Sequence, residues 1–285
     1  ANIASMKSSG IELTISSKNM RTKDFSWNTD FIFSKTKNEI TDLKSHANVL
    51  SLISGNGFGR EGYPVRGLFS IPFAGLTEDG LPTFINQDGQ KTISSFNFQE
   101  YEKLDFLKYE GPTDPTITGS FGNILTYKNL KLNVFVTYSF GNVIRLDPVF
   151  SNAYSDLDAM PKEFKNRWMK AGDENVTNIP TIVSTRMNQQ YAYLNMAYNA
   201  YNYSDVRIAD GGFIRLKEIS LSYDLPAKVI NFFRLNKLQL KLQATNLCLL
   251  YADSKLNGQD PEFFRSGGVS TPVPKQFTFT VRLGL

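Results

Sequence analysis

Few residues in this chain have the types and spacing that catalysis or metal binding requires. His46 is the only histidine and Cys248 the only cysteine, which excludes an internal disulfide and a four-ligand zinc site built from cysteine and histidine. No serine or cysteine nucleophile stands near His46 in a recognisable motif, so nucleophilic catalysis is discarded. We therefore expect that the chain is not an enzyme and that it carries no metal and no cofactor.

Two glycine-containing loops carry only weak signals for a ligand. Residues 86–89 (NQDG) resemble a calcium loop, but one carboxylate supplies too few hard oxygen ligands, and a turn is the better interpretation. Residues 55–59 (GNGFG) do not stand between a strand and a helix, as a phosphate-binding loop would. The net charge of +4 is spread along the chain without a run of Lys and Arg, so we expect no nucleic-acid partner.

The residues that could bind a ligand are aromatic. Phe, Tyr and Trp make up 13% of the chain, and tyrosines recur over residues 191–203. Aromatic rings suit both sugar stacking and protein contacts, so a nutrient and a partner protein remain equally compatible with them. The candidate binding residues, all in expected loops, are Tyr154, Trp168, Tyr191, Tyr193, Tyr198 and Tyr201.

Most long segments alternate between apolar and polar side chains, the pattern of a strand with two different faces. Seven ranges show it and are predicted to be strands: about 9–18, 24–36, 115–128, 130–141, 213–225, 237–249 and 276–285. In the last of them the apolar face consists of Phe277, Phe279, Val281, Leu283 and Leu285. A soluble β-sandwich gives the same alternation. Strands of about ten residues, longer than the usual ~5–6, and aromatic residues near strand ends favour a membrane barrel with these five residues facing lipid.

The connections alternate between short and long, as they do in outer-membrane barrels. The long ones cover residues 37–114, 142–212 and 250–275, and such loops face the outside while short turns face the periplasm. Within the first loop, residues 65–76 and 81–85 are predicted to form a hairpin. Within the second, residues 156–170 place Leu157, Met160, Phe164 and Trp168 at helical spacing, which predicts one amphipathic helix.

Two features of the strands remain open. Strict alternation puts Arg215 and Lys217 on the same side as Leu221, so either they lie above the lipid or a bulge resets the register. Seven is an odd number, whereas bacterial single-chain barrels close with even numbers of strands. Because the chain also begins at Ala1 without a methionine or a signal peptide, we expect it to be part of a longer protein.

Several blocks of sequence, in order, resemble SusC/RagA-like TonB-dependent outer-membrane transporters. They are 9–13 (SGIEL), 25–27 (FSW), 61–64 (EGYP), 74–76 (AGL), 113–115 (TDP), 119–123 (GSFGN), 213–219 (FIRLKEI), 223–226 (YDLP), 245–247 (TNL), 260–262 (DPE) and the end of the chain from residue 274. The order of these blocks over nearly the whole chain makes the resemblance specific.

The resemblance implies an all-β fold, namely the C-terminal third of a plugged, antiparallel transmembrane barrel of about 22 strands. The plug and the TonB-contacting stretch are not visible in the sequence. It further implies active import of an oligosaccharide or peptide across the outer membrane of a Gram-negative cell. The implied partners are outer-membrane lipid, the rest of the transporter, a SusD-like surface lipoprotein and the TonB complex.

Two other classes of protein remain alternatives. A passive porin or a surface adhesin could use the same barrel, although a porin would place many charges on its lumen face. An outer-membrane hydrolase would need a base, which here could only be His46 or a pair of carboxylates.

Overall fold

The computed structural model describes residues 4–54, 59–149, 162–232, 235–264 and 274–284. The chain divides into two compact units. The first, the loop unit, comprises Ala1–Ser8, Asn38–Asp114 and Asn142–Asp210, and the second, the sheet unit, comprises Ser9–Lys37, Pro115–Gly141 and Gly211–Leu285. Each unit therefore assembles from segments that are distant in the sequence.

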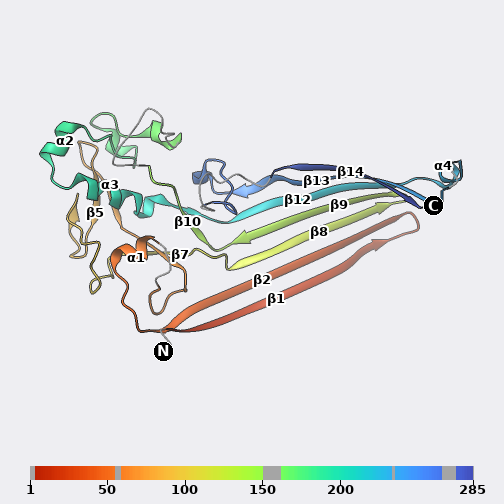
Figure 1. Cartoon of the computed structure of the whole chain (residues 1–285), viewed down its shortest axis with the longest axis horizontal. Helices are drawn as coiled ribbons and strands as arrows, with labels where there is room; N and C mark the ends of the chain where they lie inside the picture. The colour runs from red at the N-terminus through yellow and green to blue at the C-terminus, as the bar shows by residue number, and fades with distance from the viewer. Residues whose placement is uncertain (1–3, 55–58, 150–161, 233–234, 265–273, 285) are drawn as a thin grey trace. The chain divides into compact units, whose positions relative to one another are not determined.

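The sheet unit is built on a seven-stranded sheet with the strand order β1-β2-β8-β9-β12-β13-β14, and the strands lie side by side in Figure 1. Their bounds are β1 Ala4–Arg21, β2 Phe25–Leu43, β8 Ile117–Tyr127, β9 Leu130–Phe140, β12 Phe213–Asp224, β13 Lys237–Ala252 and β14 Gln276–Gly284. The pairings from β2 to β14 are antiparallel. Strands β1 and β14 form the two edges, so the sheet is open.

Each range predicted to be a strand overlaps one of these seven strands. The main differences are at the N-terminal end, where β1 and β2 are 18 and 19 residues long. Short connections join β1 to β2 and β8 to β9, and the short helix α4 (Ala227–Phe232) lies between β12 and β13. In the β8–β9 turn Lys128 has a positive φ of 51°. The side chain of Asn129 donates a hydrogen bond to the carbonyl of Asp224 at 2.9 Å.

The loop unit consists of small sheets and short helices around its own core. Strands β4 (Phe73–Leu76), β5 (Pro82–Ile85) and β6 (Lys91–Thr92) form one sheet. Two antiparallel pairs join β3 (Gly67–Ser70) to β7 (Lys108–Pro112) and β10 (Val143–Arg145) to β11 (Ile208–Asp210). The α-helices are α1 (Val49–Ser54), α2 (Thr185–Gln190) and α3 (Leu194–Asn202). Four 3-10 helices are also described: Lys162–Asn166, Asp173–Asn175 and Asp205–Arg207 in this unit, and Ser254–Leu256 in the sheet unit.

The core of the loop unit is rich in aromatic residues. Phe84 packs edge-to-face on Phe73 and Phe96, with ring centroids 5.9 and 5.4 Å away, and Phe73 also meets Tyr201 at 5.9 Å. Phe84 and Leu52 are fully buried. Rings in these arrangements stabilise a fold beyond the burial of their area, so this unit has a closed hydrophobic core of its own.

Two predictions about the loops need correction. The expected hairpin of 65–76 with 81–85 is narrower, because only β4 pairs with β5, whereas β3 pairs with β7 some forty residues further along the chain. The helix expected over 156–170 is not continuous. In its described part a 3-10 helix ends at Asn166, and Trp168 lies beyond it, where its backbone N–H donates to the carbonyl of Ile179 at 2.9 Å. The remainder of that prediction, up to residue 161, lies outside the described residues.

Candidate functional site

One face of the seven-stranded sheet is apolar from the edge strand β14 across to β2. In β14, Phe277, Phe279, Val281 and Leu283 lie opposite Ala244, Leu242, Leu240 and Leu238 of β13. The same register continues through Leu221, Leu132, Leu125 and Trp27 of β12, β9, β8 and β2. Within the chain the four β14 side chains are 77%, 62%, 47% and 62% exposed. A contiguous apolar surface of this kind marks a face that meets a protein or a membrane. The fifth predicted residue, Leu285, lies outside the described residues.

The opposite face of the sheet is polar, and its side chains bond to one another. Asn133 of β9 donates to Glu218 of β12 at 3.2 Å, and Lys241 of β13 approaches the same carboxylate at 3.9 Å. Near the edge strand Ser16 donates to Asp30 at 2.7 Å. These bonds join neighbouring strands on the face turned away from the apolar surface, which is what a barrel wall between lipid and water requires.

A bulge at Lys217 answers the question left open for Arg215. Between Leu216 and Glu218 the register shifts against both neighbouring strands, and Lys217 has no partner in either. As a result Arg215 falls on the polar face, in line with Glu218, and not on the side of Leu221. The extra residue of a bulge redirects every side chain beyond it.

Arg215 is 4% exposed and is held by a cluster of partners. Its guanidinium donates to both oxygens of Asp260, at 2.5 and 2.7 Å, and lies 3.1 Å from Glu262. The rings of Phe213 and Phe263 flank it at 5.3 and 5.9 Å. Buried cations require such pairing, so this cluster attaches the connection after β13 to the sheet.

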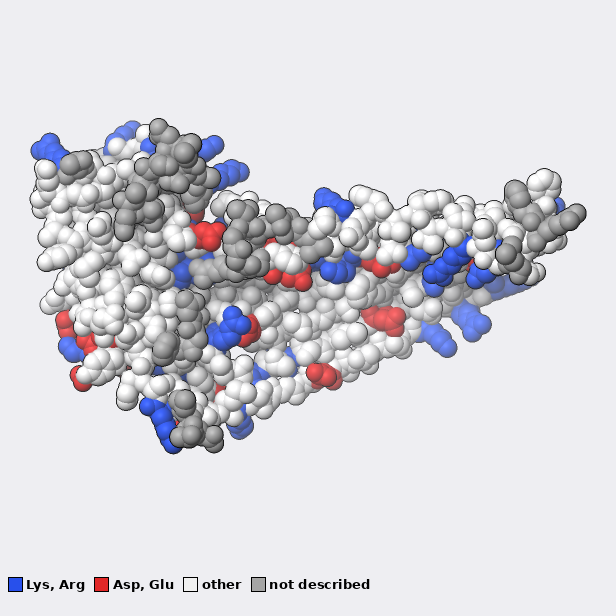
Figure 2. Space-filling model, in the orientation of Figure 1, with Lys and Arg blue, Asp and Glu red and all other residues white. Residues whose placement is uncertain are grey.

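Aromatic side chains with paired polar tips mark the ends of the strands. The indole N–H of Trp27 donates to Asn123 at 2.8 Å, and the hydroxyl of Tyr138 donates to the carbonyl of Ile32 at 2.9 Å. Figure 2 shows Lys and Arg gathered toward the sheet end that carries the short turns. Exposed cations at this end include Lys23, Lys128, Lys131, Lys228 and Lys237. Trp27 lies at this charged end and Tyr138 near the other end of the strands, and amphipathic aromatics at strand ends are typical of a membrane–water interface.

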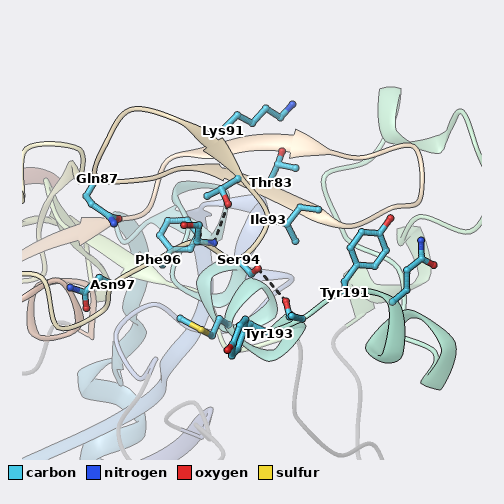
Figure 3. A pocket seen from close by; sticks show the side chains of 14 residues that line it. Thr83, Gln87, Lys91, Ile93, Ser94, Phe96, Asn97, Tyr191 and Tyr193 are labelled. Carbon is cyan, nitrogen blue, oxygen red and sulfur yellow. Dashed lines mark hydrogen bonds between the residues drawn. The ribbon is translucent and has the colours of Figure 1, made fainter.

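The loop unit contains a separate candidate site, a hollow of about 900 Å³. One wall comes from β5, β6 and the residues up to Asn97, and the other from residues 190–193 and Met196. Ser94 joins the two walls by donating to the carbonyl of Ala192 at 3.3 Å (Figure 3). The hydroxyl of Tyr191 donates to Asp79 at 3.1 Å, and this hydrogen bond raises the pKa of Tyr191 above its ordinary value.

The candidate aromatic residues separate into surface and core. Tyr191 and Tyr193 line the hollow, and Tyr193 is 74% exposed. Tyr198 and Tyr201 are only 7% and 1% exposed, so the expectation that they offer a binding surface is wrong for both. They pack inward because α3 turns one face toward the core.

The two remaining candidates lie elsewhere. Trp168 packs against Gly80, where an added Cβ would come within 2.4 Å of the indole ring, and the indole N–H donates to the carboxylate of Glu174 at 3.1 Å. Trp168 therefore contributes to local packing. Tyr154 lies outside the described residues.

Sequence reasoning missed several polar residues of the loop unit. Gln87 and Lys91 line the hollow opposite Tyr191, about a hundred positions apart in the chain, and nothing in the local sequence links them. Arg145 and Arg207 are 3% and 2% exposed. Arg145 donates to the carbonyl of Phe69 at 2.6 Å, and Arg207 pairs with Glu163 at 2.6 Å. These two arginines stabilise the core, because the guanidinium group of each bonds to polar groups from two different segments of the chain.

The described residues contain no group of three or more His, Cys, Asp and Glu side chains that could hold a metal ion. None of the described helices is long and apolar enough to cross a membrane. No protein-family model matches the chain.

The curated proteins that this chain resembles are TonB-dependent receptors. TonB-dependent receptor P3 of Formosa agariphila is 25% identical over 284 residues, a match that covers 92% of this chain and 26% of that protein. TonB-dependent receptor SusC of Bacteroides thetaiotaomicron is 25% identical over 303 residues, covering 100% of this chain and 27% of SusC. The chain thus spans little more than a quarter of the length of these relatives.

Solved structures show the same fold. A chain of the RagAB peptide transporter superposes with a TM-score of 0.71 and 23% identity, covering 99% of this chain and 30% of that chain. A chain of the RagAB peptide importer in its open-open state gives 0.70 and 21%, with 99% and 29% covered. The predicted resemblance to SusC/RagA-like TonB-dependent transporters is confirmed. By name these relatives are receptors, transporters and importers, which agrees with the expectation that the chain is not an enzyme.

Proposed function

We propose that this chain forms part of the barrel wall and the external loops of a TonB-dependent transporter in the outer membrane of a Gram-negative bacterium. The observation that carries the proposal is the apolar face that runs across six neighbouring strands of the sheet, from β2 to β14. In water this face would cost free energy in proportion to its area, about 25 cal/mol per Å². Lipid chains covering it would remove that cost.

The open sheet supports a place within a larger barrel. Both edges, β1 and β14, present unpaired backbone groups, and in hydrocarbon each such group costs several kcal/mol. Further strands of the same protein would pair with these edges and close a barrel of about 22 strands, of which this chain is the C-terminal third. The short turns then face the periplasm and the loop unit faces the outside.

The transporter needs no catalytic chemistry from these residues. Energy from the inner membrane would reach the protein through TonB, which acts on a plug encoded elsewhere in the full-length protein. The cargo is an oligosaccharide or a peptide, and a SusD-like lipoprotein sits over the external loops. By likeness, the name TonB-dependent receptor SusC supports the role of TonB, and the name RagAB peptide transporter supports a peptide as one of the two cargo classes.

Deletion of the full-length gene tests this function. The deletion strain should lose growth on one class of oligosaccharide or peptide, and a plasmid copy should restore it only in cells with a working TonB. Restoration without TonB would mean passive diffusion through a porin, and an unchanged growth profile on every nutrient would favour an adhesin.

Protease treatment of intact cells tests the orientation. Cleavage is expected only within residues 37–114, 142–212 and 250–275, because these would be the external loops. Cleavage at the β1–β2 turn or the β8–β9 turn without breaking the cells would reverse the topology.

A further inference from the structure

The hollow of the loop unit has the dimensions of a site for a small molecule. Its volume of about 900 Å³ falls within the range of about 300–1,000 Å³ that is typical of such sites. Phe96, Ile93 and Met196 give it an apolar lining, and Tyr191 and Tyr193 stand along one wall (Figure 3). The rim consists mainly of hydroxyl and amide groups.

Tyr193 has a conformation that folding alone does not favour. Its backbone is left-handed, with φ 63° and ψ 28°, at the start of α3. A non-glycine residue pays a steric cost in this region, and glycine is the residue that would avoid it. Here a large ring occupies the position and remains 74% exposed. Strained residues of this kind cluster at ligand sites.

One polar group in the lining of the hollow lacks a hydrogen-bond partner. The side-chain oxygen of Gln87 is buried without a hydrogen-bond partner in the described structure. An unpaired acceptor in such a place is costly, and a ligand hydroxyl would satisfy it. Among the described residues that line the hollow, Lys91 is the only charged one, and none is a carboxylate.

This chemistry suits a sugar better than a peptide. Peptides commonly bind by adding a strand to a free sheet edge, but the edge strand here, β6, has only two residues. The part of the lining that the structure describes also has no carboxylate to receive an N-terminal ammonium. A sugar offers an apolar ring face for tyrosine and hydroxyls for amides, and the single lysine tolerates or attracts an acidic sugar.

We propose that this hollow binds a segment of an oligosaccharide, with a sugar ring stacked on Tyr193 and a sugar hydroxyl donating to Gln87. The inference rests on the proposed function, since it assigns the cargo class and gives the external loops a site that captures it. It also separates binding of the cargo from its movement across the membrane, because the site belongs to the loop unit alone.

The test uses the full-length transporter purified in detergent. It is probed with an array of neutral and uronic-acid oligosaccharides and, in parallel, with a library of synthetic oligopeptides. We expect oligosaccharide binding, weakened about tenfold or more by Tyr193→Gly, since tenfold corresponds to the loss of one good stacking contact. Tyr193→Phe keeps the ring and should bind within about threefold of the parent.

Two controls separate binding from folding. Tyr193→Gly removes the backbone strain, so its melting temperature should equal or exceed that of the parent, whereas a ring needed for packing would lower it. Tyr101→Ala alters another exposed tyrosine of the same unit, 58% exposed, that does not line the hollow. Its binding should be unchanged.

Three results would overturn the inference. They are binding of the peptides with the same dependence on Tyr193, oligosaccharide binding that Tyr193→Gly leaves intact, and no binding of any probe. In each case TonB-dependent growth in the deletion test would still stand by itself, so failure of the site and failure of the transporter function are distinguishable.

Discussion

The loop unit and the sheet unit place their hydrophobic residues in opposite ways. In the loop unit they form a closed core around Phe84 and Tyr201. Of the buried hydrophobic residues, only Phe213 and Leu256 belong to the described part of the sheet unit. Its large apolar side chains instead cover one exposed face. The difference shows that the loop unit buries its hydrophobic residues within the chain, whereas the sheet leaves its apolar face uncovered by the described part of the chain.

Truncation of a large aromatic ring should give the largest difference between the two units in the stability that is lost. Phe84→Ala empties a fully buried position and should destabilise the loop unit by about 3–5 kcal/mol. Phe279→Ala removes a ring that is 62% exposed on the sheet face, and lipid can fill the space, so the effect should be much smaller. Hydrogen exchange of each unit in the full-length protein measures both. Equal losses would mean that the sheet face packs against protein.

A charge on the sheet face should show which face meets lipid. Val281→Arg should impair assembly by about 2–4 kcal/mol if the residue lies near the bilayer centre. Thr278→Arg in the same strand lies on the polar face opposite Gln243 and should assemble nearly normally. The folded, heat-modifiable fraction in isolated outer membranes is the measurement. Similar assembly of the two variants would contradict the lipid-facing assignment.

Alkaline pH should weaken the core of the loop unit through Tyr201. Burial raises the pKa of Tyr201 to about 12, above the ordinary value of about 10. Its stabilising contribution is therefore complete below pH ~10 and is lost as the pH rises through ~12, in total about 2–3 kcal/mol. Tyr201→Phe cannot ionise, so its stability should fall less over this range. The comparison is made by hydrogen exchange of the loop unit, and parallel pH profiles would exclude Tyr201 as the titrating group.

The smallest effect is expected for an ion pair on the surface of the loop unit. Arg66 and Asp114 lie 2.9 Å apart, but their side chains are 58% and 51% exposed. Asp114→Asn should change stability by less than about 1 kcal/mol, because water screens the pair. The melting temperature of the loop unit should stay nearly constant. A large drop would show that the pair is covered in the assembled protein.

The strand pattern could be predicted from the sequence because it is local. Side chains alternate every two residues, so strand positions and the apolar face of β14 follow from neighbours in the chain. The expected helix over 156–170 fails in its described part for a related reason. Helical spacing was present, but Trp168 finds its partners at Gly80 and Glu174, and these contacts outweigh a weak local preference.

Features that depend on residues far apart could be found only in the tertiary structure. The pairing of β3 with β7, the bulge at Lys217 that turns Arg215 toward Asp260, and the hollow between β6 and α3 each join distant segments. Periodicity carries no information about such contacts, since the same alternation fits more than one register and partner. The sequence by itself determined that the chain makes long two-faced strands. Only the fold decided which residues are enclosed in the loop unit and which stay exposed on the sheet face, because burial depends on what lies opposite each side chain.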